Sequence, residues 1–122
     1  MTIETKNLGK EGEHLAEKFL KENGYKIIKT NYRFGKGEID IIAEDPEDKF
    51  LVFVEVKTRN TTEYGTPESA VTPGKIRQIK KIAELYLYEN EIHEQDCRFD
   101  VIAIVLNYNK NIELTHYKSA FM

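Results

Sequence analysis

Apolar and polar residues alternate with a period of two along two neighbouring stretches of the chain, residues 37–44 and 51–59. Both stretches are rich in isoleucine and valine, and this combination is the signal of β-strands. The segment between them, Asp45-Pro46-Glu47-Asp48, has the composition of a tight turn. The pattern therefore predicts an antiparallel hairpin.

The same alternation fixes the register of this hairpin. If the hairpin is symmetric about residues 47–48, the numbers of facing residues sum to 95. Three apolar pairs then share one face: Ile39/Val56, Ile41/Val54 and Ala43/Val52. On the other face Asp40 lies opposite Glu55, and Glu38 lies opposite Lys57. A slip by one residue would set polar positions against apolar ones, so the pattern favours this register.

The remaining elements follow from periodicity and from start and stop signals. An apolar stripe of helical period before Gly24 predicts a first helix that ends at a left-handed glycine. Thr72-Pro73 is a helix start, with threonine as N-cap and proline in the first turn. The expected elements are a helix from Gly9 or Glu11 to Asn23, a strand over 25–32, the hairpin, a helix over 73–89, and strands over 98–106 and 112–117.

Composition limits the class of protein. A chain of 122 residues is expected to form one domain, residues 1–122, with a single core. It has no apolar run near the ~20 residues of a membrane span, and its start lacks a signal-peptide pattern. The lone Cys97 excludes an intramolecular disulfide and fits a reducing, cytoplasmic setting. A net charge of −3 disfavours a generic nucleic-acid coat protein.

The polar face of the hairpin carries the candidate chemistry. Facing Cβ atoms lie about 4.5–5.5 Å apart, and like charges placed there destabilise a sheet. Asp40 and Glu55 therefore need a shared proton or a cation between them, and carboxylate oxygens suit Mg²⁺ or Mn²⁺. Lys57 lies two residues beyond Glu55, roughly 6.5 Å along the same face. The alternative is a surface hairpin with solvated charges. It is weakened by the apolar run LVFVEV, which is typical of a central strand.

Asp40, a gap of fourteen residues and then Glu55-Val56-Lys57 resemble the PD-(D/E)xK nuclease signature. Five longer stretches, in this order, are similar to the YraN family of predicted endonucleases: GKEGEHLAEKFLKENGYKII, NYRFGKGEIDIIA, FVEVKTR, TPGKIRQIKKIA and RFDVIAI. The resemblance covers most of the chain. It implies a restriction-endonuclease-like α/β fold, with a mixed sheet of about five strands flanked by helices in the order αβββαββ.

The resemblance also implies roles for individual residues. Asp40 and Glu55 would bind a divalent metal, and Lys57 would assist the attacking water. Ile39 stands where the superfamily signature has proline. Related resolvase-like nucleases have a metal-site glutamate on the first helix, and Glu13 matches it; a solvated surface glutamate is the alternative. The implied metal ligands are Asp40, Glu55, Val56 and Glu13.

Several residues near the motif are candidates for binding DNA. A polar loop over residues 60–72 leaves the strand directly after the motif and is expected to cover the site. The candidates are Arg33, Lys36, Arg59, Tyr64, Lys75 and Lys80. The second helix is basic in its first half and acidic from Glu84 to Asp96, so we expect its basic end near the site. The alternatives to DNA binding are that residues 33–37 form a plain turn and that the basic residues of the second helix simply face solvent. Arg98 and Asp100 are expected in a polar network behind the metal.

Together these features favour a nuclease that uses Mg²⁺ or Mn²⁺ to hydrolyse phosphodiester bonds in DNA, with branched or damaged DNA among the candidate substrates. Two alternatives stay open: a nucleic-acid-binding module without catalysis, and a partner-binding adaptor on the same fold. A homodimer or a protein partner would help a small acidic chain to grip DNA.

Overall fold

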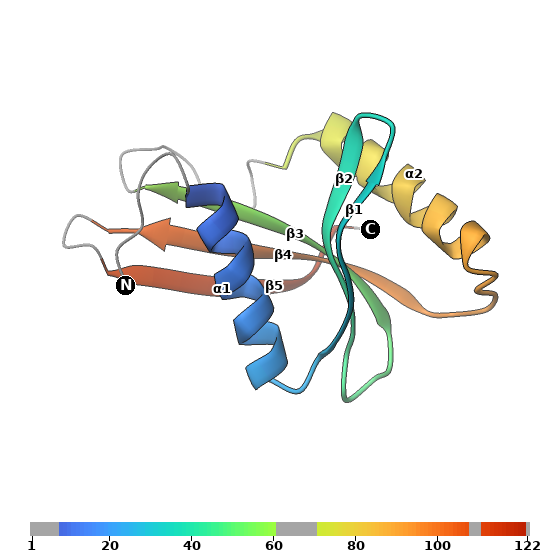
Figure 1. Ribbon diagram of the computed structural model, residues 1–122, viewed down its shortest axis with the longest axis horizontal. Helices are drawn as coiled ribbons and strands as arrows, with labels where there is room; N and C mark the ends of the chain where they lie inside the picture. The colour runs from blue at the N-terminus through green and yellow to red at the C-terminus, as the bar shows by residue number, and fades with distance from the viewer. Residues whose placement is uncertain (1–7, 61–70, 108–110, 122) are drawn as a thin grey trace.

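The computed structural model describes residues 8–60, 71–107 and 111–121. The elements follow the order αβββαββ that the sequence predicts (Figure 1). They are α1 (Leu8–Glu22), β1 (Lys26–Phe34), β2 (Gly37–Glu44), β3 (Leu51–Asn60), α2 (Pro73–Glu89), β4 (Cys97–Leu106) and β5 (Ile112–Phe121). The last strand extends beyond its expected end at Tyr117. None of the helices in the described part is long and apolar enough to cross a membrane.

The five strands form one mixed sheet in the order β1-β2-β3-β4-β5. Among the described strands, only β3 and β4 pair in parallel, because the chain crosses over through α2 between them. The two helices cover opposite faces (Figure 1). On the α1 face, Ala16 and Leu20 pack against Val52 and Val54; on the other, residues of α2 pack against Phe53. The sheet with its flanking helices is the restriction-endonuclease-like core that the sequence predicts.

Both helices carry the terminal signals read from the sequence. Gly24 follows α1 with a φ of 85°, a left-handed conformation that glycine adopts without strain. Thr72 caps α2, and its hydroxyl accepts a hydrogen bond of 3.2 Å from the Lys75 N–H. Pro73 occupies the first turn of the helix. Thr72 and Pro73 together fix where α2 begins, and thereby where its basic first turn lies.

The predicted hairpin register is confirmed for the half nearer the turn. Ile41 pairs with Val54, and Ala43 pairs with Val52. The ladder between β2 and β3 then stops at Ile41, so the pairs expected further along do not form. Ile39 packs in the core cluster of α2, whereas Ile41 packs in that of α1. The prediction that these two isoleucines share one face is therefore wrong.

A bend in β2 at Asp40 explains this departure. The Val56 N–H donates a hydrogen bond of 2.8 Å to Asp40 Oδ2, so a side chain takes the place of the backbone partner. On the other side, β1 pairs with β2 through Thr30 and Tyr32, and Asn31 between them has a φ of 51°. Irregular features of β3 and β1, the strands on either side of β2, thus lie beside Asp40: the Val56 N–H bonds to a side chain, and Asn31 is left-handed.

Candidate metal centre

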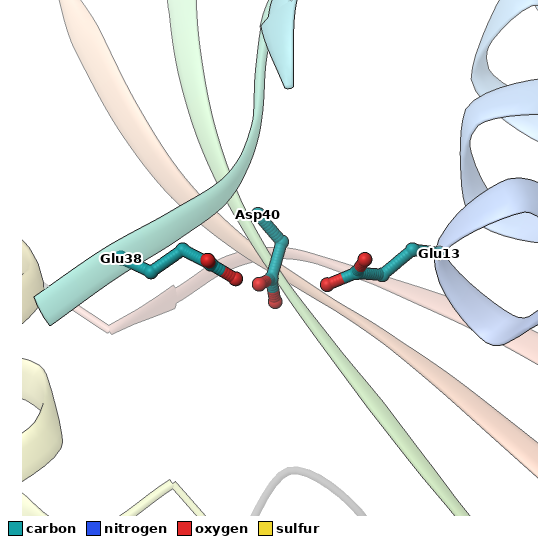
Figure 2. A group of neighbouring side chains, drawn as sticks. All are labelled: Glu13, Glu38 and Asp40. Carbon is teal, nitrogen blue, oxygen red and sulfur yellow. The ribbon is translucent and has the colours of Figure 1, made fainter. Parts of the chain in front are cut away.

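Three carboxylates from two elements converge beside this bend. Asp40 and Glu38 come from β2, and Glu13 comes from α1; one oxygen of each lies within 4.8 Å of the others. Figure 2 shows the Asp40 carboxyl between the other two, with Glu38 and Glu13 reaching towards it from opposite sides. Asp40 is buried, and the two glutamates are half-buried. Such a group of oxygens repels itself unless protons or a cation are present.

Glu55, on β3, is the buried partner of Asp40. Its side chain is only 6% exposed, and its Oε2 atom has no hydrogen-bond partner among the residues that the structure describes. Burial raises the pKa of Asp40 to about 9, and the negative charge of Glu55 adds to that shift. Burial also raises the pKa of Glu55, and its carboxyl is in hydrogen-bonding contact with that of Asp40. When no cation is present, burial therefore favours a proton on this pair of carboxyl groups.

Two lysines act on this pair from different elements. The charges of Lys75, in the first turn of α2, and of Lys57, on β3, both lower the pKa of Glu55 against the effect of burial. Lys57 lies two residues after Glu55 on the same strand. The α2 helix therefore brings a second positive charge to the pair, which matches the expectation that its basic end lies near the site.

A glycine lets α1 approach the sheet closely enough for Glu13 to reach Asp40. A Cβ atom at Gly12 would overlap with Thr58 Cγ2 on β3 and would lie 3.3 Å from Thr58 Cβ. Gly12 directly precedes Glu13, and a bulkier residue there would push this turn of α1 away from β3. A cavity of about 130 Å³ opens beside the carboxylates, and its lining includes Glu13, Asn31 and Asp40.

The donor set fits a hard divalent cation. Mg²⁺ and Mn²⁺ prefer oxygen ligands, usually one or two carboxylates with water in the remaining positions. The buried Glu55 Oε2 atom is the strongest sign of such an ion, because an unpartnered carboxylate oxygen in a protein interior is costly. Asp40, Glu13 and Glu38 supply further oxygens within one small volume.

Comparison with known proteins places the chain in a family. The model of "Uncharacterised protein family UPF0102" matches residues 12–104. The chain belongs to the UPF0102 family. Similar members include a UPF0102 protein of Pelobacter propionicus, 46% identical over 97% of this chain and 84% of the relative. Another, from Natranaerobius thermophilus, is 46% identical over 98% of this chain and 100% of the relative. The YraN-type resemblance of the sequence is confirmed.

A much weaker similarity links this UPF0102 chain to "The structure of Pyrococcus Furiosus SfsA in complex with Ca2+". The identity is 17%, the TM-score is 0.34, and the match covers 95% of this chain and 64% of the other. A TM-score this low does not establish a shared fold. The family description names no activity, so the function of UPF0102 proteins has to be argued from the site.

The structure separates the residues that the sequence grouped as DNA contacts. Arg33 is exposed and forms a 2.7 Å ion pair with Glu38, and Lys36 lies exposed in the β1–β2 turn. Arg59 is buried within the protein. Lys80 lines a different pocket, with Glu84 among its neighbours. Tyr64 lies outside the described residues.

Sequence reasoning placed Glu38 opposite Lys57 and did not count it among the metal ligands. Its position two residues before Asp40 on one strand was the available signal, because such residues share a face of a regular strand. The bend in β2 then brings both carboxylates to Glu13. Val56, expected as a ligand, is the N–H donor to Asp40 in this UPF0102 protein; its carbonyl as a metal ligand stays a prediction.

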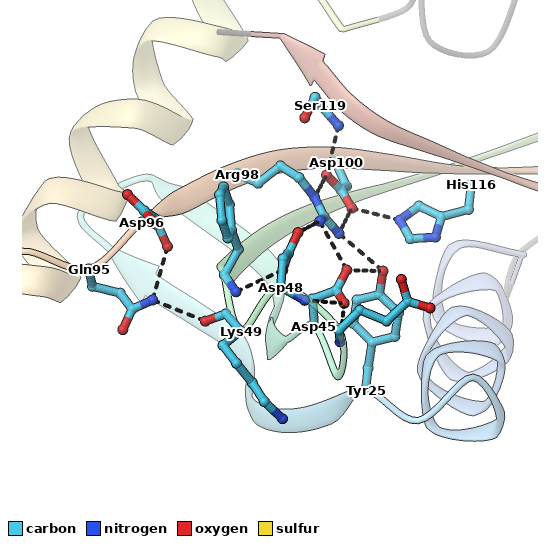
Figure 3. Close-up of polar contacts among 12 residues, drawn as sticks. Tyr25, Asp45, Asp48, Lys49, Gln95, Asp96, Arg98, Asp100, His116 and Ser119 are labelled. Carbon is cyan, nitrogen blue, oxygen red and sulfur yellow. Dashed lines mark hydrogen bonds and ion pairs between the residues drawn. The ribbon is translucent and has the colours of Figure 1, made fainter.

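Arg98 and Asp100 form a buried polar network whose members do not include the four carboxylates described above (Figure 3). Arg98 pairs with Asp100 at 2.9 Å and with Asp45 at 3.0 Å (Figure 3). His116 contacts Asp100 at 2.7 Å, and Tyr25 donates to Asp45 at 2.9 Å. The network joins β4, β5 and the β2–β3 turn, so the expected polar network is confirmed, and its support of a metal site stays a prediction.

Proposed function

We propose that this protein is a metal-dependent endonuclease that uses Mg²⁺ or Mn²⁺ to hydrolyse phosphodiester bonds in DNA. The observation that carries the proposal is the buried Asp40–Glu55 pair with its unpartnered Glu55 Oε2 atom. Glu13 and Glu38 add negative charge within 4.8 Å of Asp40. A site built only for stability would not place two buried carboxyl groups beside each other, because one of them must then take up a proton or meet a cation.

The residues of the site have distinct roles in this reaction. Asp40 and Glu13 would hold the ion together with Glu55, whose carboxyl is in hydrogen-bonding contact with that of Asp40. Glu38, within 4.8 Å of Asp40 and Glu13, would add a further carboxylate oxygen. The ion supplies charge neutralisation at phosphorus and lowers the pKa of bound water. Lys57, on the strand of Glu55, orients the attacking water, and Lys75 stabilises negative charge that develops on the phosphate.

Substitution of Asp40 by asparagine tests the proposal directly. Asparagine keeps the size of the side chain and an acceptor for the Val56 N–H, but it removes the charge that the ion needs. We expect Asp40→Asn to be at least as stable as the parent without metal, and to lose the stabilisation that Mg²⁺ or Mn²⁺ gives the parent in thermal unfolding. Glu44→Gln, on the same strand but outside the carboxylate group, is the matched control.

Cleavage provides the second readout. A panel of branched, flapped and single-stranded DNAs is incubated with either metal, and Asp40→Asn is expected to lose activity by orders of magnitude, about 10²-fold or more. Lys57→Ala should keep the metal-dependent stabilisation and lose mainly the rate. Metal-dependent cleavage that Asp40→Asn leaves intact would assign the activity to another site or to a contaminant. DNA binding without any cleavage would favour the binding-module alternative.

A further inference from the structure

A basic groove begins next to the acidic group and has no role in the chemistry proposed above. It lies between the β1–β2 turn and α2, two elements that run side by side in Figure 1. Its volume is about 350 Å³, within the ~300–1,000 Å³ range of ligand pockets. Among the described residues that line it, three are cations and none is acidic: Lys36, Arg77 and Lys81. This is notable in a chain with a net charge of −3.

The lining of the groove is apolar as well as basic. Ile82 and Leu85 of α2 contribute to the lining, and so does Phe34 at the end of β1. Phe34 is 47% exposed, which is unusual for a large apolar side chain in this protein. Positive charges beside an accessible aromatic ring are the combination with which proteins bind single-stranded nucleic acid, the ring stacking on a base and the cations contacting phosphates.

Gly37 connects the groove to the carboxylates. It lines the groove, and it is followed directly by Glu38. Gly37 precedes Asp40 by three residues, which is about 10 Å along a strand. A Cβ atom at Gly37 would collide with Ile82 Cδ1 and lie 2.9 Å from Gln78 Cδ, so the absence of a side chain allows the turn to approach α2.

We infer that this groove binds a single-stranded segment of DNA, with its phosphates against Lys36, Arg77 and Lys81 and a base against Phe34. The inference rests on the proposed function, because the groove would bind the DNA strand that adjoins the phosphate cleaved at the carboxylates. It narrows the substrate to DNA with an unpaired segment next to the cut. The bases of intact duplex are not accessible for stacking on Phe34.

Equilibrium binding of labelled oligonucleotides in EDTA tests the groove without involving the metal. The double variant Arg77→Gln/Lys81→Gln removes two exposed cations of the groove. We expect single-strand affinity to fall at least about 10-fold at low salt, and the slope of log K against log salt to become shallower by about 1.4. Lys18→Gln/Lys26→Gln changes the net charge equally at exposed sites outside the groove and should leave the slope unchanged.

Phe34 is tested separately from the charges. Phe34→Ala should weaken single-strand binding about 5- to 150-fold and duplex binding much less, and Phe34→Tyr should retain the parent affinity. The inference is overturned if Lys18→Gln/Lys26→Gln loses as much single-strand affinity as Arg77→Gln/Lys81→Gln. It is also overturned if poly-glutamate displaces the bound strand as well as unlabelled single-stranded DNA does, or if the parent binds duplex and single strand with equal affinity. If Asp40-dependent cleavage survives such a result, the proposed function stands without the groove. If the groove variants behave as expected but the parent never cleaves, the groove stands and the nuclease falls.

Discussion

Replacing Gly12 by alanine should disturb both the stability and the metal site, because α1 contacts the sheet through this glycine. The added methyl group would overlap with Thr58 Cγ2, and it would lie 3.6 Å from Ile104 Cδ1. Overpacking of this kind typically costs about 1–3 kcal/mol. Alanine in a helix also stabilises by up to about 1 kcal/mol relative to glycine. We therefore expect Gly12→Ala to lower the free energy of unfolding by roughly 0–3 kcal/mol.

Gly9→Ala is the matched control, because it makes the same change one turn earlier in the same helix. Gly9 is exposed, and a Cβ atom there would have nothing within 4 Å. This variant should be neutral or more stable than the parent by at most about 1 kcal/mol. The difference between the two variants in urea unfolding then measures the cost of the overlap, about 1–3 kcal/mol.

A double substitution checks the mechanism. Thr58→Ser removes the Cγ2 methyl group that the new Cβ atom would meet. Gly12→Ala in the Thr58→Ser background should therefore cost much less than in the parent, with a coupling energy of about 0.5–3 kcal/mol. Gly12→Ala should also weaken the Mn²⁺-dependent rise in melting temperature, since Glu13 moves with its turn. A Gly12→Ala variant as stable as Gly9→Ala would refute the close approach of α1 to β3.

Two further predictions concern the buried Arg98 network. Arg98→Met leaves the buried carboxylates of Asp45 and Asp100 without their cation, so it should lower the free energy of unfolding by about 3–5 kcal/mol; Arg33→Met, which breaks an exposed pair, should cost no more than about 1 kcal/mol in the same urea titration. Hydrogen bonds from the Glu47 N–H, Tyr25 and Arg98 outweigh burial and lower the pKa of Asp45 to about 2. Contacts with His116 and Arg98 outweigh burial at Asp100 and lower its pKa as well. Since a lowered carboxyl pKa stabilises the fold above the unfolded value near 4, this contribution should disappear as the pH falls from about 4 to about 2. Urea midpoints measured across that range should show the loss in the parent and a smaller loss in Arg98→Met; an equal loss in both would contradict the assignment.

The sequence predicted those features that depend on local pattern. Alternation and caps determine the elements, and complementary faces determine the register of Ile41 with Val54. The position of Ile39 could not be predicted, because it depends on a bend that arises when Asp40 binds the backbone of the next strand. Regular pleating is the assumption behind every prediction from a period of two, and it fails where a side chain replaces a ladder hydrogen bond.

Contacts between residues that are far apart in the sequence could not be predicted either. Arg98 meets Tyr25 through a hydrogen bond of 3.0 Å, although 73 positions separate them in the chain. Nothing in either segment alone indicates this partner. The convergence of Glu13 with Asp40 was suggested only by family resemblance, since a helix-surface glutamate has no pattern that marks it as a ligand.

Asp40 has consequences for how mutations in this family are interpreted. One of its oxygens joins β2 to β3 through the Val56 N–H, so the residue is part of the backbone architecture as well as of the acidic group. An alanine at this position would leave a buried amide without an acceptor, at a cost of about 1–3 kcal/mol. Loss of activity in an alanine scan would then mix misfolding with missing chemistry. Asparagine keeps the acceptor and removes only the charge, so it separates the architectural role of Asp40 from its role in the acidic group.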